Sequence, residues 1–163
     1  MHKKQLILDT TVCIDLFNGK LLRAATRLPY ELALPDVIVD ELINPSGRHL
    51  LQIGYSVLHL PPEAIEKVTN LRERYTKPST NDLFALLMAK LHSCELITGD
   101  DALRKAAHRE KVTTHGVLWL LDRLVEHNIL TPEEAADALE NILAGGSWLP
   151  NKECEARLKH WKQ

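Results

Sequence analysis

Two short apolar segments, each ending in an aspartate, constrain the fold of this chain most strongly. Residues 6–8 read Leu-Ile-Leu before Asp9, and residues 96–99 read Leu-Ile-Thr-Gly before Asp100. A helical pattern follows both. Short apolar runs of this kind are typical of parallel strands buried on both faces, and α/β proteins place their functional groups where such strands end. The sequence therefore predicts two strand-end carboxylates, which suggest a metal site if they meet in space.

The rest of the chain alternates between strand and helix patterns. Strands are expected at residues 5–8, 31–34, 55–60, 95–98 and 112–114. Helices are expected at residues 10–17, 20–28, 36–43, 61–75, 79–92, 101–111, 117–127, 131–145 and from 150 onward. This alternation predicts an α/β fold, a three-layer sandwich with a mostly parallel central sheet. At 163 residues the chain is most simply a single domain.

Composition narrows the class of protein further. A net charge of -2 and a pI near 6.4 exclude a surface that binds polyanions everywhere, so any nucleic-acid contact must be local. The three cysteines form no C-x-x-C pair, which favours reduced thiols in a cytoplasmic protein and makes zinc an unlikely metal. The charged N-terminus leads into a run of only three apolar residues before Asp9, too short for the apolar core of a signal peptide or for a membrane span. We expect a soluble, cytoplasmic protein without a membrane segment.

If the strands at residues 5–8 and 95–98 are neighbours, four acids are expected to face one rim of the sheet. Asp9 and Asp100 end strands, Glu41 lies in the helix after the second strand, and Asp82 lies in the first turn of the helix before the fourth strand. Two carboxylates about 4 Å apart repel by about 4 kcal/mol at an effective dielectric near 20, so protons or cations must neutralise them. Hard oxygen ligands favour Mg²⁺ or Mn²⁺. The alternative is that Asp82 is only a first-turn acid stabilised by the helix dipole, and that Glu41 is only a surface acid of its helix.

At this point the residues resemble a known family, the PIN-domain nucleases, and especially the small single-domain members that include VapC-like toxins. The resemblance rests on four segments, residues 6–15 (LILDTTVCID), 34–42 (LPDVIVDEL), 79–82 (STND) and 96–103 (LITGDDAL). It covers about residues 5–130. It therefore implies one PIN-like domain over residues 1–163, with a core at about 5–130 and extra C-terminal helices at about 131–163.

The resemblance also assigns roles to single residues. The metal-binding and catalytic acids would be Asp9, Glu41, Asp82 and Asp100. Thr11 would be the hydroxyl residue that supports the first acid. Asp101 could hold a second ion, although an N-cap role for the following helix is favoured. Asp40 is expected to be a solvated neighbour, and Asp15 is expected to face solvent.

The leading hypothesis for function is a Mg²⁺- or Mn²⁺-dependent endoribonuclease that hydrolyses single-stranded RNA, either alone or as the toxin of a toxin–antitoxin pair. The alternative is a non-catalytic PIN-like module that acts through a protein partner. Its helices from Gly116 onward, with Trp148 and Trp161, could form a homodimer face or dock an antitoxin, although an exposed tryptophan could also stack on a base. A doubly wound phosphatase is disfavoured because Asp9 is not followed by a second acid in a D-x-D pattern.

Overall fold

A five-stranded sheet forms the centre of the molecule. The computed structural model describes residues 3–163. Its strands are β1 (Lys4–Leu8), β2 (Tyr30–Pro35), β3 (Ser56–Leu58), β4 (Glu95–Ile97) and β5 (Thr114–His115). They are arranged in the order β3-β2-β1-β4-β5, and every pairing between neighbours is parallel. The predicted α/β fold with a parallel central sheet is confirmed.

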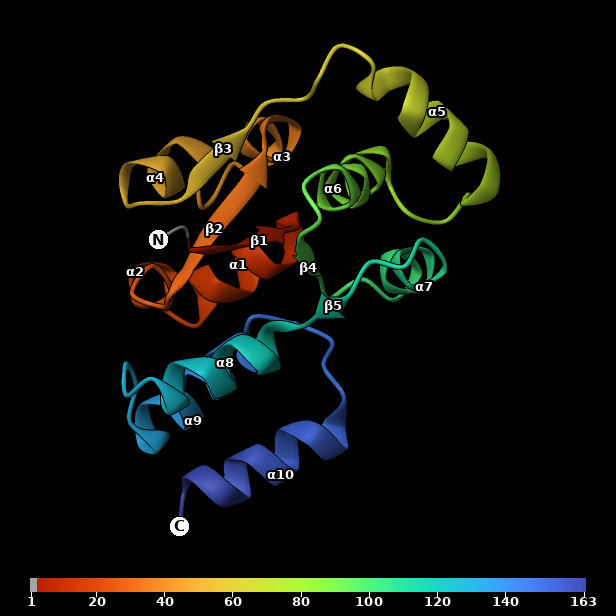
Figure 1. The fold of residues 1–163 in the computed structure, drawn as a ribbon. Helices are drawn as coiled ribbons and strands as arrows, with labels where there is room; N and C mark the ends of the chain where they lie inside the picture. Colours follow the sequence, from red (N-terminus) through yellow and green to blue (C-terminus); the bar gives the residue numbers. More distant parts are fainter. Residues whose placement is uncertain (1–2) are drawn as a thin grey trace.

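Helices cover both faces of this sheet. They are α1 (Thr10–Asn18), α2 (Leu22–Ala25), α3 (Asp36–Glu41), α4 (Gly47–Gln52), α5 (Ala64–Arg74), α6 (Thr80–Leu91), α7 (Asp101–Arg109), α8 (Val117–Glu126), α9 (Pro132–Ala144) and α10 (Asn151–Trp161). Helix α6 packs on β1, β2 and β4 beside α5 and α7, while α1 packs with α2, α8 and α9. Figure 1 shows α5 and α6 on one side of the sheet and α8, α9 and α10 on the other. The molecule is thus a three-layer sandwich.

Burial explains why the apolar runs form the centre of the sheet. The three residues Leu6, Ile7 and Leu8 of β1 are completely buried, as expected for a parallel strand covered on both faces. Residues 85–89 of α6 are buried one after another, so this helix is enclosed around most of its circumference. Each large apolar side chain buried in this way contributes about 1.5–3 kcal/mol. Hydrophobic burial therefore fixes β1 and α6 together.

Three elements differ from the sequence prediction. The helix expected at 20–28 is only the single turn α2. The last strand begins at Thr114, not at Val112, because the Val112 backbone N–H donates to the Ala107 carbonyl and closes the end of α7. Helix α4 was not predicted, because the turn-forming residues before it concealed its N-cap, Ser46, whose hydroxyl accepts from the His49 N–H. None of these changes moves the carboxyl ends of β1 and β4.

The C-terminal helices pack against the helix layer that contains α1 and α8. Helix α9 begins with the predicted capping box, in which Thr131 and Glu134 bond each other's backbone N–H. It packs against α1, α8 and α10. Among residues 3–163, every helix is too short or too polar to cross a membrane.

Candidate active site

The sheet topology places a crevice between β1 and β4. After β1 the chain adds β2 and β3 on one side of that strand, then returns to add β4 and β5 on the other side. Parallel sheets bind ligands at the carboxyl ends of their strands where the order reverses in this way. Asp9 directly follows β1, and its backbone N–H donates to the Ile97 carbonyl of β4 at 3.1 Å. The first predicted acid therefore lies at the reversal point, and Asp100 follows the neighbouring strand.

Asp9 is a buried carboxylate that is bound only by neutral donors. Its side chain is the N-cap of α1, and Oδ1 accepts from the Val12 N–H and the Thr11 hydroxyl, both at 2.9 Å. Oδ2 accepts from the Thr98 hydroxyl. Burial raises the pKa of Asp9 from its usual 3.8 to about 6, although these hydrogen bonds act in the opposite direction. No lysine, arginine or histidine in residues 3–163 forms an ion pair with it.

Asp100 occupies the equivalent position after β4. Its side chain caps α7, with Oδ2 accepting from the Leu103 N–H at 2.8 Å. Its backbone N–H donates to the Thr98 hydroxyl at 3.0 Å, and that same hydroxyl donates to Asp9. The completely buried Thr98 thus joins the two strand-end acids. This role of Thr98 was not predicted from the sequence, where the available signal was a hydroxyl residue at the end of an otherwise apolar strand.

Asp82 and Glu41 approach the crevice from helices α6 and α3. Asp82 shares a capping box with Ser79, whose N–H donates to Oδ2 at 3.1 Å. Burial raises the pKa of Asp82, and the charges of Asp100 and Glu41 raise it further. The charge of Asp82 in turn raises the pKa of Asp9. Glu41 is the exposed last residue of α3, and its Oε2 accepts from the Thr10 hydroxyl at 2.5 Å. Asp82 therefore lies close enough to each of the other three acids for their charges to influence one another.

The remaining acids near the rim occupy different environments. Asp101 is not the N-cap of α7, because Asp100 has that role; its side chain is 78% exposed and pairs with Lys105 at 3.0 Å. The expectation that Asp15 faces solvent was wrong, since this residue is only 7% exposed. Burial raises the pKa of Asp15 to about 6, against a hydrogen bond from Ser147. Asp40 is exposed, as expected.

The donor chemistry of the rim suits a hard divalent cation. Carboxylate and hydroxyl oxygens surround the crevice, and the buried Asp9 has no cation of its own. In the part of the chain that the structure describes, no three His, Cys, Asp or Glu side chains are grouped closely enough to hold one ion by themselves. Mg²⁺ is usually bound by only one or two carboxylates and keeps several waters. The residues therefore fit Mg²⁺ or Mn²⁺ bound through few direct ligands.

Comparison with protein families identifies the fold's relatives. A family model described as a PIN domain matches residues 5–163. The chain belongs to the PIN-domain family. The match extends through the C-terminal helices as well as the sheet. No curated protein matches it significantly.

Solved structures share the architecture of this PIN domain at low sequence identity. The protein PAE2754 from Pyrobaculum aerophilum is 18% identical with a TM-score of 0.58, covering 76% of this chain and 91% of its own. The PilT N-terminus domain protein SSO1118 from Sulfolobus solfataricus P2 is 16% identical with a TM-score of 0.52, covering 76% and 95%. VapBC2 from Rickettsia felis, bound to a DNA fragment from its promoter, is 15% identical with a TM-score of 0.51, covering 69% and 98%. These likenesses concern the fold.

Proposed function

We propose that this PIN domain is a Mg²⁺- or Mn²⁺-dependent endoribonuclease that hydrolyses phosphodiester bonds of single-stranded RNA. The observation that carries the proposal is the buried carboxylate of Asp9, which lies at the reversal point of the sheet without a cationic partner in residues 3–163. A buried charge of this kind is costly unless something neutralises it. A divalent cation from solution would do so at the place where parallel sheets bind their ligands.

Each acid has a distinct role in this proposal. Asp9, Asp82 and Asp100 would hold the ion or ions, one or two of them as direct ligands and the rest through bound water. Glu41 would hold a second ion or orient the attacking water. A bound ion would stabilise the charge on the phosphate and lower the pKa of a water molecule. The hydroxyls of Thr11 and Thr98 fix the orientation of the Asp9 carboxylate through their hydrogen bonds. Thr10 does the same for Glu41.

We extend the proposal to the biological setting of the chain. The protein would act in the cytoplasm as the toxin of a toxin–antitoxin pair, with an antitoxin protein as its partner and a homodimer as its own assembly. Membership of the PIN-domain family and the likeness to VapBC2 support this setting.

One observation favours a second candidate function. The carboxylates of the rim are not gathered into a group of three ligands within residues 3–163. A PIN-like module that has lost catalysis and acts only through a protein partner would need no such group. The two functions differ in whether the acids are required for cleavage.

The test is cleavage of a mixed pool of single-stranded RNA with Mg²⁺ or Mn²⁺. We expect Asp100→Asn to reduce the rate by about 100-fold or more, because the charge stabilisation supplied by a bound ion is worth several kcal/mol. Asp40→Asn is the matched control, since Asp40 is an exposed acid next to Glu41 and should retain the full rate. Circular dichroism would check that both variants fold. Equal cleavage by wild type and Asp100→Asn, or none by wild type, would contradict the proposal.

A further inference from the structure

A cleft of about 590 Å³ opens beside the candidate active site. One wall contains Gly99 and Asp101, the two residues on either side of Asp100. The other wall comes from the C-terminal segment and includes Trp148 and Glu153. Small-molecule sites commonly occupy about 300–1,000 Å³, so the cleft is large enough for a nucleotide-sized group. The C-terminal helices thus form a surface that continues directly from the rim.

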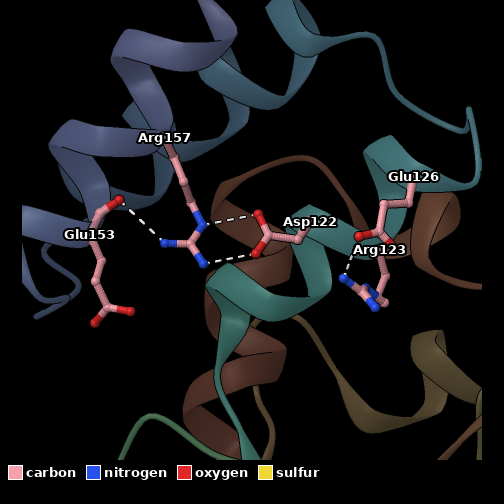
Figure 2. A network of polar contacts seen from close by, with 5 residues as sticks. All are labelled: Asp122, Arg123, Glu126, Glu153 and Arg157. Carbon is pink, nitrogen blue, oxygen red and sulfur yellow. Dashed lines mark hydrogen bonds and ion pairs between the residues drawn. The ribbon is translucent and has the colours of Figure 1, made fainter.

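The C-terminal wall is held in place by one arginine. Arg157 of α10 donates from Nε and Nη2 to the two carboxylate oxygens of Asp122 in α8, at 3.0 and 2.8 Å, and from Nη1 to the Glu153 carbonyl at 3.3 Å (Figure 2). Bidentate pairs of this kind are strong and fix orientation. At the end of the helix, Trp161 is 4% exposed and anchors α10 in the core. The wall is therefore preformed, and the guanidinium of Arg157 is already engaged.

Three groups at the cleft remain free to bind a ligand. Trp148 belongs to the segment that connects α9 to α10, and it is 96% exposed. Arg104 donates one Nη2 bond to the Thr98 carbonyl at 3.0 Å and has no acidic partner within the described chain. The carboxylate of Glu153 likewise has no partner there, and Figure 2 shows it directed away from Arg157. The other acids of the cleft are engaged, Asp101 by Lys105 for example.

An aromatic ring, a guanidinium and a carboxylate match the parts of a nucleotide. Bases of single-stranded nucleic acid stack on exposed aromatic side chains without regard to sequence. An arginine binds phosphate oxygens through charge-assisted hydrogen bonds. A glutamate accepts hydrogen bonds from an exocyclic amino group of a base. The free groups Trp148, Arg104 and Glu153 supply these three interactions.

A protein partner fits the cleft less well. A helix that docks in a groove needs a row of apolar anchors. Among the described residues that line this cleft, Trp148 is the only large apolar side chain that is substantially exposed. The other exposed apolar side chains, such as Ile43 and Ile65, lie elsewhere in the fold. The chemistry of the cleft therefore favours a nucleotide.

We propose that this cleft is a subsite for one nucleotide of single-stranded RNA next to the scissile phosphate, with its base stacked on Trp148 and its exocyclic amino group bound by Glu153. The inference rests on the proposed ribonuclease function, because it places the subsite beside Asp100. The same contacts predict which bases the subsite prefers. Adenine, cytosine and guanine carry an exocyclic amino group, and uracil does not. The subsite should therefore disfavour uridine.

The test measures binding separately from cleavage. Fluorescence anisotropy would follow labelled oligoadenylate and oligouridylate of about 12 nucleotides, a length within the range of single-strand sites. The binding is measured without divalent metal, so that no oligonucleotide is cut. Trp148→Ala should weaken oligoadenylate binding by about 5- to 150-fold, the effect of losing one stacked base. Glu153→Ala should remove the preference for oligoadenylate over oligouridylate.

Two exposed residues provide matched controls. Ile65→Ala removes an apolar side chain that is 72% exposed on α5, and Arg48→Ala removes an exposed arginine on α4, at the opposite edge of the sheet from the cleft. Both should bind RNA like the wild type. A further variant, Trp148→Phe, keeps an aromatic surface and should retain most of the affinity lost in Trp148→Ala. Partial retention would separate stacking from a general effect on folding.

The outcomes distinguish the subsite from the proposed function. If Trp148→Ala binds RNA as tightly as wild type while wild type cleaves RNA, the subsite is wrong and the ribonuclease proposal stands. If binding depends on Trp148 but wild type cleaves no RNA with Mg²⁺ or Mn²⁺, the subsite is supported and the ribonuclease proposal fails. If Trp148→Ala loses only the binding of a protein partner, the occupant is a protein and the subsite is overturned.

Discussion

Two buried carboxylates lie at opposite ends of the sheet, and only one of them has cationic partners. Asp9 lies at the carboxyl ends of the strands. Glu110 follows α7 and borders the same cavity as Glu95, the first residue of β4. The Glu110 side chain is 5% exposed and pairs with Arg74 at 2.8 Å and Lys90 at 2.7 Å, and the Tyr75 hydroxyl also donates to it. Asp9 has only hydroxyl and backbone donors.

The difference shows how to separate a structural acid from a functional one. Burial alone would raise the pKa of Glu110, but Lys90, Tyr75 and Arg74 together lower it below its usual value. Burial raises the pKa of Asp9 to about 6, and nothing in the described chain supplies a compensating positive charge. The protein therefore neutralises one acid from within and leaves the other uncompensated. Such uncompensated acids in a crevice are characteristic of functional sites.

Stabilisation of the folded protein by Mn²⁺ should distinguish Asp9 from Glu110 most clearly. An ion that binds the folded protein at 100 times its dissociation constant raises the free energy of unfolding by about 2.7 kcal/mol. We expect a concentration-dependent increase in Tm for the wild type and for Glu110→Gln. We expect none for Asp9→Asn. A calorimetric titration with equal shifts in Asp9→Asn and wild type would show that the ion binds elsewhere.

The second prediction concerns Glu110 itself. Glu110→Gln keeps the shape of the side chain but removes the charge that binds Arg74 and Lys90. We expect the free energy of unfolding to fall by about 2 kcal/mol, because two cations and a part-buried hydroxyl lose their charged partner. Urea unfolding would measure the change. Cleavage per folded molecule should not change. A loss of cleavage at full stability would show that Glu110 is also needed for function and is not a purely structural acid.

Much of this comparison could be predicted from the sequence because the relevant signals are local. Asp9 and Asp100 follow apolar runs that can only be buried strands in a chain of this pattern, and Ser79 precedes a strongly apolar helix in the way N-caps do. The alternation of strands and helices also predicted the parallel sheet, but it did not predict that β1 and β4 are neighbours. These features depend on residues that are close together along the chain.

The parts that could not be predicted depend on tertiary packing. Thr98 bonds Asp9 across 89 positions, and nothing in the sequence indicates that partner. Asp15 is buried because α8 and α9 pack against α1, a contact between segments far apart in the chain. The two cations and the hydroxyl around Glu110 come from the end of α5 and from α6, which are far from Glu110 along the chain. Local patterns therefore predicted that Asp9 and Asp100 follow strands, whereas the hydrogen-bond partners of these acids could be found only from the fold.

In the absence of metal, the charge of Asp9 should have a smaller effect on the free energy of unfolding, and this effect depends on pH. The folded-state pKa of about 6 lies above the usual value of 3.8, so the folded protein binds the proton more tightly than the unfolded chain does. This contribution to stability is complete below about pH 4 and is lost as the pH rises through about 6. At neutral pH the buried carboxylate is charged and destabilises the metal-free protein.

Replacing that charge should therefore stabilise the metal-free protein at neutral pH. We expect Asp9→Asn to raise the free energy of unfolding by about 1–2 kcal/mol at pH 7.5, less than the full linkage value because the amide must reorient against the hydroxyl of Thr98. The gain should disappear near pH 4, where Asp9 is protonated in the wild type.

Urea unfolding with a chelator present, repeated across this pH range, measures the difference. Because Asp15 titrates in both proteins, subtracting the two profiles isolates Asp9. A destabilised Asp9→Asn at pH 7.5 would mean that the carboxylate is compensated within the protein, as Glu110 is.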